Sequence, residues 1–348
     1  PHDCAGSNLF AHSRRGEVMR MVPRENEAIN EVWLSDRDRF SYEGLASEDR
    51  LVTPMVKVDG EWQNVDWETA LQTTVEGIRA ILDAHGAEQM GVLVSPAATL
   101  EEMQLTQAVA RGVGINNIDH RLRQTDFADQ DNAPLCPSLG QSIEALETVN
   151  AALVIGSNTR KDQPIIGHRL RKAAVNGAQV MFVNPIDYEF LFDVHAKVVV
   201  PPSQMVANLA AIAACFPEAT GSDAVKAAIT AARVDDTHRA MAQALQDADR
   251  ATVLRGNVAA AHPRFSLLKA LAGAIAAASG AVLGILTDGA NGAGGWLAGV
   301  LPHRGPAGTD VASKGLHAAA MLAEPRKGYL LFGVEAAHDC ANPAQAAK

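Results

Sequence analysis

The residues of this chain that could carry metal or redox chemistry are its four cysteines, Cys4, Cys136, Cys215 and Cys340. No two of them form a CxxC pair, and no histidine stands at a zinc-like spacing from a cysteine or another histidine. A cubane iron–sulfur cluster uses about four thiolate ligands, and a serine oxygen rarely replaces a thiolate on iron. The cysteines therefore predict scattered free thiols, which fits a reducing cytosol.

Two glycine-containing turns are the other candidate sites. They are Gly156, Ser157 and Asn158 in the first turn, and Asn291 and Gly292 in the second. Ligands of open α/β sheets bind outside the carboxyl ends of strands, and glycine lets a backbone approach an anion closely. Neither turn is a Walker loop or a GxGxxG fingerprint. We predict tightly turned loops at both places, with a phosphate-binding loop as the alternative.

These turns are positioned by short apolar runs that alternate with helical stretches. Such runs are typical of buried parallel strands, and their alternation with helices indicates right-handed βαβ units and a parallel sheet. The predicted strands are Met90–Val94, Ala152–Gly156, Gln179–Val183, Lys197–Val200, Thr252–Gly256, Ala281–Ile285 and Tyr329–Gly333. The predicted helices are Trp67–Ala84, Leu100–Arg111, Ile166–Val175, Gln204–Cys215, Asp223–Ala232 and Thr237–Gln246.

The N-terminal part is predicted to be a small, mostly β module. Loose alternation across residues 8–22, with a turn at Arg15-Gly16, favours a hairpin. A dense set of charged residues then flanks Trp33 and Phe40. It is either an interface with a neighbouring subunit or a local salt-bridge network. The charged residues are Arg20, Arg24, Asp36, Arg37, Asp38 and Arg39.

Composition excludes several classes of protein. The net charge of −10 disfavours nucleic-acid binding, which usually needs clustered Lys and Arg. No window reaches the roughly 18 apolar residues of a membrane span. A length of 348 residues with 47% hydrophobic residues predicts two or more units with their own cores. Because the sequence starts at Pro1 without Met, we expect it to be part of a longer protein.

A family resemblance rests on the segment RGEVMRMVPRENEAINEVWLSDRDRFSYEGL, from Arg15 to Leu45. It resembles the iron–sulfur-linked module that opens molybdopterin oxidoreductases, and most closely that of the large G-type peripheral-arm subunits of bacterial NADH–quinone oxidoreductase (respiratory complex I). The family pattern is a Cys-x2-Cys-x3-Cys run, a Gly-Glu-Val turn and a Trp-x-Cys-Asp-x-x-Arg-Phe segment, whose cysteines hold a [4Fe–4S] cluster. Here Cys4 remains, whereas Ser7 and Ser35 stand where the resemblance implies thiolates. The resemblance therefore implies the frame of a cluster site that has lost its cluster.

The resemblance covers nearly the whole chain and implies its fold. We expect an α/β protein in which a small N-terminal β module precedes interleaved Rossmann-like parallel-sheet domains of the molybdopterin oxidoreductase (formate dehydrogenase-like) type. Residues 1–55 would form the module. Residues 56–149 plus 281–348 would form the first α/β domain, and residues 150–280 an inserted Rossmann-like domain.

The resemblance also gives a meaning to the candidate sites. The two glycine-containing turns would be remnants of pterin-binding loops. A molybdenum or tungsten ion would be held near Arg123–Asp129, where no cysteine occurs and Asp126 and Asp129 are the candidate ligands. We expect no catalytic residue, no bound cofactor and no metal in this chain.

The implied function is that of a scaffold in the peripheral arm of a proton-pumping NADH–quinone oxidoreductase. The resemblance implies [2Fe–2S] and [4Fe–4S] clusters in an N-terminal portion missing here, with NADH and quinone acting at other subunits. The partners would be other peripheral-arm subunits, on the cytoplasmic face of the bacterial inner membrane. One alternative is an active molybdenum- or tungsten-pterin oxidoreductase, which needs a metal ligand and intact cluster cysteines. The other is a free-standing binding module, which needs a polar pocket near Gly156 and Asn291.

Overall fold

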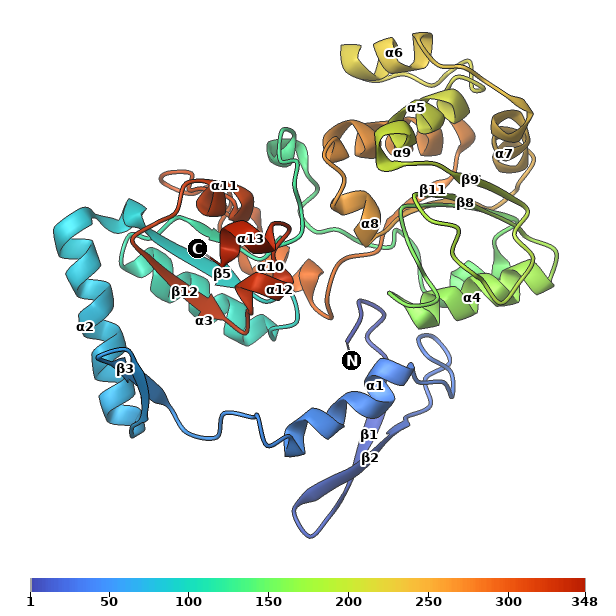
Figure 1. The fold of residues 1–348 in the computed structure, drawn as a ribbon. Coiled ribbons are helices and arrows are strands. Elements are labelled where there is room, and N and C mark those ends of the chain that lie inside the picture. The colour runs from blue at the N-terminus through green and yellow to red at the C-terminus, as the bar shows by residue number, and fades with distance from the viewer. Residues whose placement is uncertain (1, 348) are drawn as a thin grey trace.

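The computed structural model describes residues 2–347, which form three parts. Figure 1 shows a small N-terminal β module and two α/β bodies, each built around a parallel sheet. One of these sheets has five strands and the other has three. The predicted α/β class with a small N-terminal β module is confirmed.

The five-stranded sheet has the strand order β11-β10-β7-β8-β9, and all its pairings are parallel. Its strands are β7 (Ala151–Ile155), β8 (Gln179–Asn184), β9 (Ala196–Val199), β10 (Ala251–Arg255) and β11 (Val282–Ile285). Strands β7 and β10 are buried along their whole length, as expected where both faces of a parallel sheet are covered. Each apolar run predicted between residues 152 and 285 forms one of these strands.

Helices cover both faces of this sheet. Leu153 and Ile155 of β7 belong to a core that includes several helices on one face, whereas Ala152 and Val154 belong to the core on the other face, which contains one long helix. This alternation follows from the two-residue period of a strand. The helices are α5 (Pro202–Ala213), α7 (Asp236–Gln246) and α9 (Phe265–Ser279) on the first face, with α6 (Asp223–Thr230) beside them, and α4 (Pro164–Val175) on the second.

The smaller sheet has the order β12-β5-β6 and is also parallel. Its strands are β5 (Met90–Val94), β6 (Ile118–Asp119) and β12 (Gly328–Phe332). This body is therefore assembled from segments that flank the five-stranded sheet in the sequence. Its helix α3 (Leu100–Gly112) begins with a capping box: Thr99 Oγ1 accepts the Glu102 N–H at 3.2 Å, and the Glu102 carboxylate accepts the Thr99 N–H at 2.8 Å.

Strand β11 begins just after residue 280, the expected boundary between the two α/β domains. Just after this boundary, Val282 pairs with Thr252 and Ile285 with Arg255 in the five-stranded sheet. Leu283 also packs against the core that contains α9. The five-stranded sheet therefore continues past residue 280. A short apolar run predicts that a strand forms, but it does not predict which strand it pairs with.

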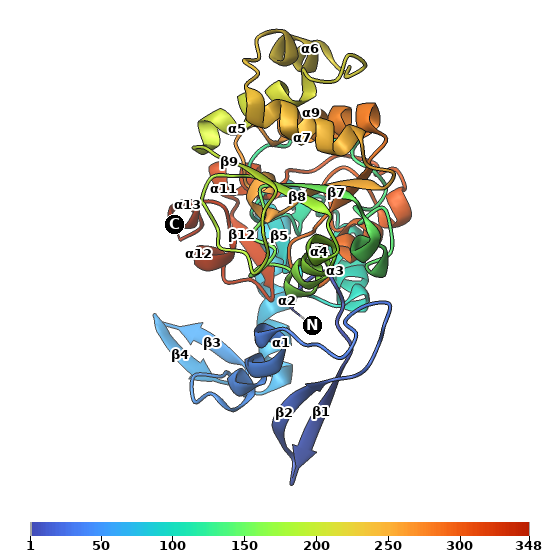
Figure 2. The ribbon, with the colours of Figure 1, turned by 90° about the vertical axis from the view of Figure 1, so that its right-hand side faces the viewer.

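The N-terminal module contains the predicted hairpin. Strands β1 (Leu9–Arg14) and β2 (Glu17–Pro23) are antiparallel, and Arg15 and Gly16 of the turn both have positive φ, 53° and 86°. The helix α1 (Asp36–Phe40) and the 3-10 helix η1 (Ser41–Ala46) follow. Figure 2 shows the hairpin extending away from the two α/β bodies.

The charged set of this module makes contacts both inside the module and outside it. Inside, Arg20 Nε donates to His12 Nδ1 at 3.1 Å. Outside, Arg37 Nη2 donates to the carbonyl oxygen of Asp162, in the α/β body, at 2.5 Å. Members of the charged set therefore form contacts within this chain. An interface between this set and another subunit stays a prediction.

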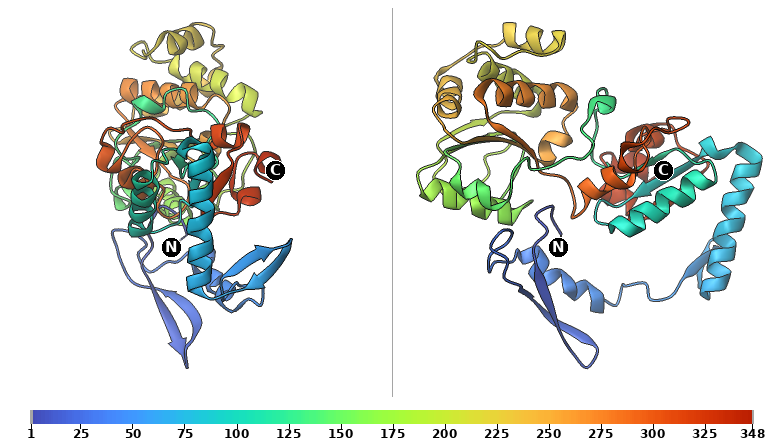
Figure 3. Two further views of the ribbon diagram at one scale, coloured as in Figure 1. Left: turned by 90° about the vertical axis from the view of Figure 1, so that its left-hand side faces the viewer. Right: turned by 180° about the vertical axis from the view of Figure 1, so that it is seen from behind.

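A second hairpin and a long helix connect the module to the smaller sheet. Strands β3 (Met55–Val58) and β4 (Glu61–Asn64) turn at Asp59-Gly60. Helix α2 (Trp67–His85) begins after Asp66, whose carboxylate accepts the Thr69 N–H at 2.8 Å, as an N-cap should. None of the residues of α2 is buried. Figure 3 shows this helix at one edge of the molecule.

Short helices occupy the remaining connections. They are η2 (Ala87–Gln89), η3 (Gln130–Asn132), η4 (Glu144–Thr148), α8 (Asn257–Ala260), α10 (Gly292–Ala298), η5 (Pro306–Gly308), α11 (Ala318–Ala323), α12 (Ala336–Asp339) and α13 (Pro343–Ala346). Across residues 2–347, no helix has both the length and the apolar character that a membrane span requires.

Candidate functional site

The first candidate site is the N-terminal loop that carries Cys4. This thiol is partly buried, packs against the core shared with α4 and lies beside Thr287. Burial raises the pKa of Cys4 to about 11, and the nearby Asp3 adds to the rise. In the metal-free chain this thiol is therefore protonated at neutral pH.

The other two positions of the family pattern are Ser7 and Ser35, and both side chains are buried. Ser35 is the N-cap of α1: its Oγ accepts the Asp38 N–H at 3.1 Å and donates to the Asp38 carboxylate at 3.0 Å. The Ser7 side chain is buried, and its Oγ has no hydrogen-bond partner within the described residues. Ser35 therefore stabilises a helix start.

The donor set at these positions does not fit a [4Fe–4S] cluster. It offers one thiol, Cys4, and two hydroxyls, Ser7 and Ser35, where a cubane uses about four thiolates. In the described part of the chain, no group of three or more His, Cys, Asp or Glu side chains is placed to hold a metal ion. We therefore derive no chemistry through a cluster in this chain.

The first glycine-containing turn closes against the protein itself. Gly156 has φ 56°, and a Cβ added there would lie 2.4 Å from the backbone nitrogen of Ala259. Asn184 holds the next residue on both sides: its Oδ1 accepts the Ser157 N–H at 2.9 Å, and its Nδ2 donates to the Ser157 carbonyl at 3.0 Å. Gly156, Ser157 and Asn158 are absent from the lining of the cavity described below. The tight-turn interpretation accounts for these contacts.

The second glycine-containing turn also packs against protein atoms. A Cβ at Gly289 would lie 2.8 Å from the carbonyl oxygen of Pro96, and one at Gly295 would lie 2.6 Å from the His120 ring. Asn291 Nδ2 donates to the Ala98 carbonyl at 2.9 Å. Gly289 lets the turn pack onto the loop after β5, and Gly295 lets α10 approach His120 just after β6, as in a tightly turned loop. Of the two residues proposed for this site, Gly292 lines the neighbouring cavity and Asn291 does not.

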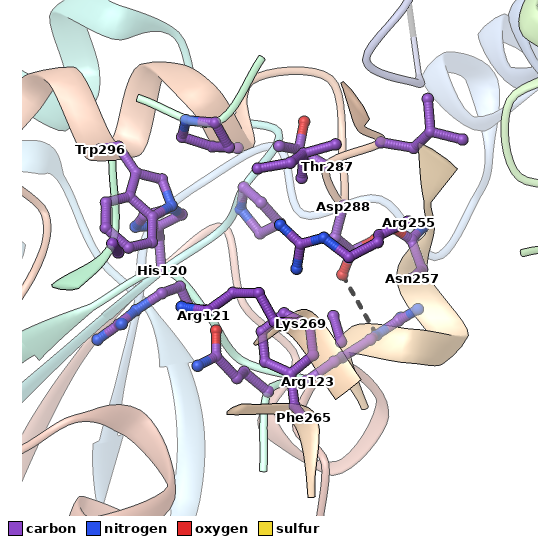
Figure 4. Close-up of a pocket in the computed structure, with 18 of the residues that line it drawn as sticks. His120, Arg121, Arg123, Arg255, Asn257, Phe265, Lys269, Thr287, Asp288 and Trp296 are labelled. Carbon is purple, nitrogen blue, oxygen red and sulfur yellow. Dashed lines mark ion pairs between the residues drawn. The ribbon is translucent and has the colours of Figure 1, made fainter. Parts of the chain in front are cut away.

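That cavity lies where strands β10 and β11 end, between the two α/β bodies (Figure 4). Its volume is about 130 Å³. The carboxyl edge of a parallel sheet is where ligands of α/β folds bind. Sequence reasoning found part of this site, since Arg123 and Asp129 of the candidate metal segment and Gly292 of the second turn line it, but it did not find Arg255, which lies far away in the sequence. The side chains that line it include Arg121, Arg255, Asn257, Phe265, Lys269 and Trp296.

Two cations of the cavity are paired with buried or half-buried carboxylates. Arg121 makes a bidentate pair with Asp119, from Nε to Oδ1 at 2.8 Å and from Nη2 to Oδ2 at 2.9 Å. The Asp119 side chain is fully buried; burial alone would raise its pKa, but the charge and hydrogen bonds of Arg121 lower it overall. Lys269 Nζ lies 2.6 Å from Asp129 Oδ2. These pairs neutralise two of the positive charges around the cavity.

Arg255, unlike Arg121 and Lys269, forms no ion pair within residues 2–347. Only 4% of the residue is exposed, and its guanidinium lies over the Phe265 ring, 5.5 Å from the centroid. Within residues 2–347 its Nε has no hydrogen-bond partner, and no carboxylate lies within ion-pair distance of it. Burial lowers the pKa of Arg255 to about 10, so the side chain stays charged at neutral pH.

The cavity does not fit a pterin cofactor with its metal. Pockets for drug-sized ligands measure about 300–1,000 Å³, several times the 130 Å³ found here. The two candidate metal ligands are also engaged: Asp126 accepts the N–H groups of Ala128 at 3.0 Å and Ser266 at 2.8 Å, and Asp129 pairs with Lys269. We therefore derive no step through molybdenum or tungsten.

Comparison with known protein families covers both parallel-sheet bodies of this structure. The model of the molybdopterin oxidoreductase family matches residues 50–346. The chain belongs to the molybdopterin oxidoreductase family. Residues 2–43 match a second model, the NADH-ubiquinone oxidoreductase NDSU1/NuoG-like 4Fe-4S domain. The family resemblance inferred from the Arg15–Leu45 segment is thus confirmed.

Individual relatives fall into two groups. The chain is 34% identical to the G subunit of the NADH-quinone oxidoreductase of Rickettsia felis over 183 residues, which cover 51% of this chain and 26% of the relative. It is 29% identical to the F420-dependent formate dehydrogenase subunit alpha of Methanocaldococcus jannaschii over 189 residues, which cover 53% and 27%. The match therefore spans about a quarter of the length of these relatives.

A solved structure agrees on the fold. Acetylene hydratase from Pelobacter acetylenicus superposes with a TM-score of 0.58 at 13% identity, over 84% of this chain and 44% of that one. At this identity the likeness is one of fold alone.

Proposed function

We propose that this chain is the molybdopterin-oxidoreductase-like portion of a large G-type peripheral-arm subunit of bacterial NADH–quinone oxidoreductase, acting as a scaffold without a cofactor of its own. The observation that carries the proposal is the donor set at the N-terminal loop. Residues 2–43 match an iron–sulfur domain model, yet Ser7 and Ser35 stand at thiolate positions and Ser35 caps a helix. In this proposal the fold of the iron–sulfur domain is kept, while serines replace two of its cysteine ligands.

In this proposal the electrons from NADH pass through clusters outside the present sequence. Those [2Fe–2S] and [4Fe–4S] clusters belong to an N-terminal portion of the intact subunit, and NADH and quinone act at other subunits. The partners are other peripheral-arm subunits, on the cytoplasmic face of the bacterial inner membrane. The similarity to the Rickettsia felis relative supports this assignment.

Helix α2 supplies a surface suited to such a partner. Trp67, Leu71, Val75 and Ile78 follow one another at helical spacing, and the first three are 71%, 60% and 44% exposed. Trp62 of the adjacent hairpin is 62% exposed. A contiguous exposed apolar stripe of this kind marks an interaction surface. We propose that another peripheral-arm subunit covers it.

We also propose that the five-stranded sheet forms a domain inserted into the body that carries β5 and β12. The expected ranges were 1–55 for the module, 56–149 plus 281–348 for the outer domain and 150–280 for the insert. The pairing of β11 supports an insert that extends through Ile285. Limited proteolysis tests the division: cuts are expected in the connections that flank Asn150 and Leu286, and resistance there argues against two domains.

A second candidate function is an active molybdenum- or tungsten-pterin oxidoreductase. The similarity to the F420-dependent formate dehydrogenase subunit alpha favours it. The engaged carboxylates of Asp126 and Asp129 and the small cavity count against it.

Metal and pterin analysis decides between the two candidates. We expect less than about 0.1 iron, acid-labile sulfide, molybdenum, tungsten or pterin per chain in protein purified without oxygen and incubated with iron and sulfide, because a cubane needs about four thiolates. Near-stoichiometric iron and sulfide would contradict the cofactor-free proposal. Molybdenum or tungsten with pterin would establish the enzyme instead.

Two variants control this measurement. If residual iron is held by the N-terminal loop, Cys4→Ala removes it. Cys136→Ala, which changes a thiol in a different part of the chain, leaves it unchanged. Iron that is retained in both variants is held by neither thiol and is adventitious.

A further inference from the structure

The cavity between the two α/β bodies holds a positive charge that the protein does not neutralise. Arg121, Arg123, Arg255 and Lys269 line it. Arg121 and Lys269 are paired with carboxylates, and Arg123 Nε lies 3.8 Å from Asp288 Oδ2. Among the described residues, Arg255 has no acidic partner at ion-pair distance. Asp129, which pairs with Lys269, also acts electrostatically on Arg255, so four cations face three carboxylates and the site carries a net charge of about +1.

Burying an unpaired charge is unfavourable, and binding an anion would offset this cost. Isolated ions lose several kcal/mol of hydration when they are buried. Arg255 is 4% exposed, and its Nε, which belongs to the fork that recognises carboxylates, has no hydrogen-bond partner in the described chain. Arg121 also has a buried Nη1 without a partner. Because these two nitrogens are closed off from solvent, a ligand in the cavity meets the outer nitrogens of the Arg255 guanidinium.

The net charge of the site favours a monoanion. Arg121, Lys269 and Arg123 each have a facing carboxylate, which leaves one positive charge on Arg255. A planar carboxylate matches the guanidinium fork with two parallel hydrogen bonds. A phosphate dianion would leave one negative charge unpaired in a largely buried space.

The walls and the volume limit the rest of the ligand. The aromatic rings of Phe265 and Trp296 and the side chain of Leu286 border the cavity and offer apolar contact. A cavity of about 150 Å³ holds benzene, which has six carbon atoms. The present 130 Å³ therefore suits a molecule of about six non-hydrogen atoms.

We propose that this cavity binds a short-chain aliphatic monocarboxylate of about four carbons, with its carboxylate on the Arg255 fork and its chain against Phe265 and Trp296. Figure 4 shows Arg255, Phe265 and Trp296 around the same space. The proposal goes beyond the scaffold function and does not depend on it. A scaffold without redox cofactors would then carry a binding site for small organic acids.

Thermal unfolding of the 348-residue chain with four probes tests the proposal. Butyrate is expected to raise the midpoint in a concentration-dependent way, because a ligand that binds only the folded state stabilises it. Butyramide, which has the same shape without the charge, is expected to have no effect. Formate and inorganic phosphate serve as the small carboxylate and the dianion. Stabilisation by phosphate alone, by butyramide as much as butyrate, or by none of the four overturns the proposal.

Variants locate the site. Calorimetric titration with butyrate is expected to show at least about tenfold weaker binding to Arg255→Met, which loses a hydrogen-bonded charge pair. Arg255→Lys retains the charge without the fork and is expected to bind at an intermediate strength. The matched control Arg233→Met changes an exposed arginine and is expected to leave binding unchanged. Equal butyrate affinity in Arg255→Met, Arg255→Lys and wild type also overturns the proposal.

Discussion

Glu31 joins the N-terminal module to the five-stranded body. Its carboxylate pairs with His168 Nε2 at 3.0 Å, with Arg169 Nη1 at 2.9 Å and with Lys172 Nζ, all on α4. Arg169 is 2% exposed and also pairs with Glu147. Glu31 itself has φ 49°, a backbone conformation that residues with a Cβ rarely adopt. The contact therefore outweighs a local backbone cost.

The first prediction concerns Glu31→Gln. We expect it to lower the free energy of unfolding by about 1–2 kcal/mol at pH 7, because charged hydrogen bonds to Lys172 and Arg169 are lost. Burial by itself raises the pKa of Glu31, but the hydrogen bonds from Lys172 and His168 lower it to about 2. Urea unfolding at several pH values measures the difference.

The pH dependence follows from the sign of that shift. A carboxylate whose pKa is depressed in the folded state stabilises the protein above its unfolded pKa of about 4.5 and loses this effect as the pH falls toward 2. The gap between wild type and Glu31→Gln should therefore be full at pH 7 and shrink below about pH 4.5. Glu48→Gln, at an exposed position, is the control. A gap that is constant down to pH 3 contradicts the assignment.

Single residues also mark the limit of sequence reasoning. Ser7 and Ser35 were found because a motif fixes the positions at which cysteines are expected. Arg255 was not found, because it stands at the end of an apolar run and nothing in the sequence shows that it lacks an acidic partner. Burial and pairing of charges depend on segments that the sequence keeps far apart.

At the scale of elements, the chain was largely predictable. Continuous apolar runs give the buried strands β5, β7, β8 and β10, and the caps at Asp66 and Thr99 begin α2 and α3 where expected. The pairing of β11 was not predictable, because its partner is decided by packing against α9 and by hydrogen bonds to β10. The β6 strand of two residues is too short to leave a pattern.

The turn after β7 provides the second prediction. Gly156→Ala should lower the free energy of unfolding by at least about 2 kcal/mol, because the new Cβ meets the Ala259 backbone and the φ of 56° is unfavourable. Gly177→Ala is a matched control, since Gly177 also has positive φ, 94°, but has open space where the Cβ would lie. It should cost about 1 kcal/mol. Chemical denaturation compares the two, and equal losses would show that backbone conformation alone is responsible.

At the scale of the whole molecule, the N-terminal half of α2 presents an apolar stripe to solvent. Ile78 packs against the core of the smaller body, whereas Trp67, Leu71 and Val75 stay exposed. Sequence reasoning predicted the helix but not its exposure, because amphipathic spacing predicts that one face is covered and does not say by what.

The third prediction tests whether a partner covers α2. In cells that make the complete NADH–quinone oxidoreductase, Leu71→Asp should strongly reduce incorporation of the chain into the complex, while its own free energy of unfolding changes by less than about 0.5 kcal/mol. Thr73→Asp introduces the same charge on the opposite side of the helix and should leave assembly intact. Co-purification with the peripheral arm measures incorporation. Equal incorporation of both variants would exclude α2 as a docking surface.

The pairing of β5 with β12 has a consequence for how the protein is made. Met90 pairs with Gly328 and Val94 with Phe332, although the ribosome synthesises the first strand long before the second. Domains generally fold as units during synthesis, N-terminal parts first, but β5 must wait with one edge open until the segment Gly328–Phe332 has emerged. The intervening five-stranded body has all its own strands by then. We therefore expect the nascent chain to fold from its middle outward, with the exposed edge of β5 as the segment most in need of a chaperone.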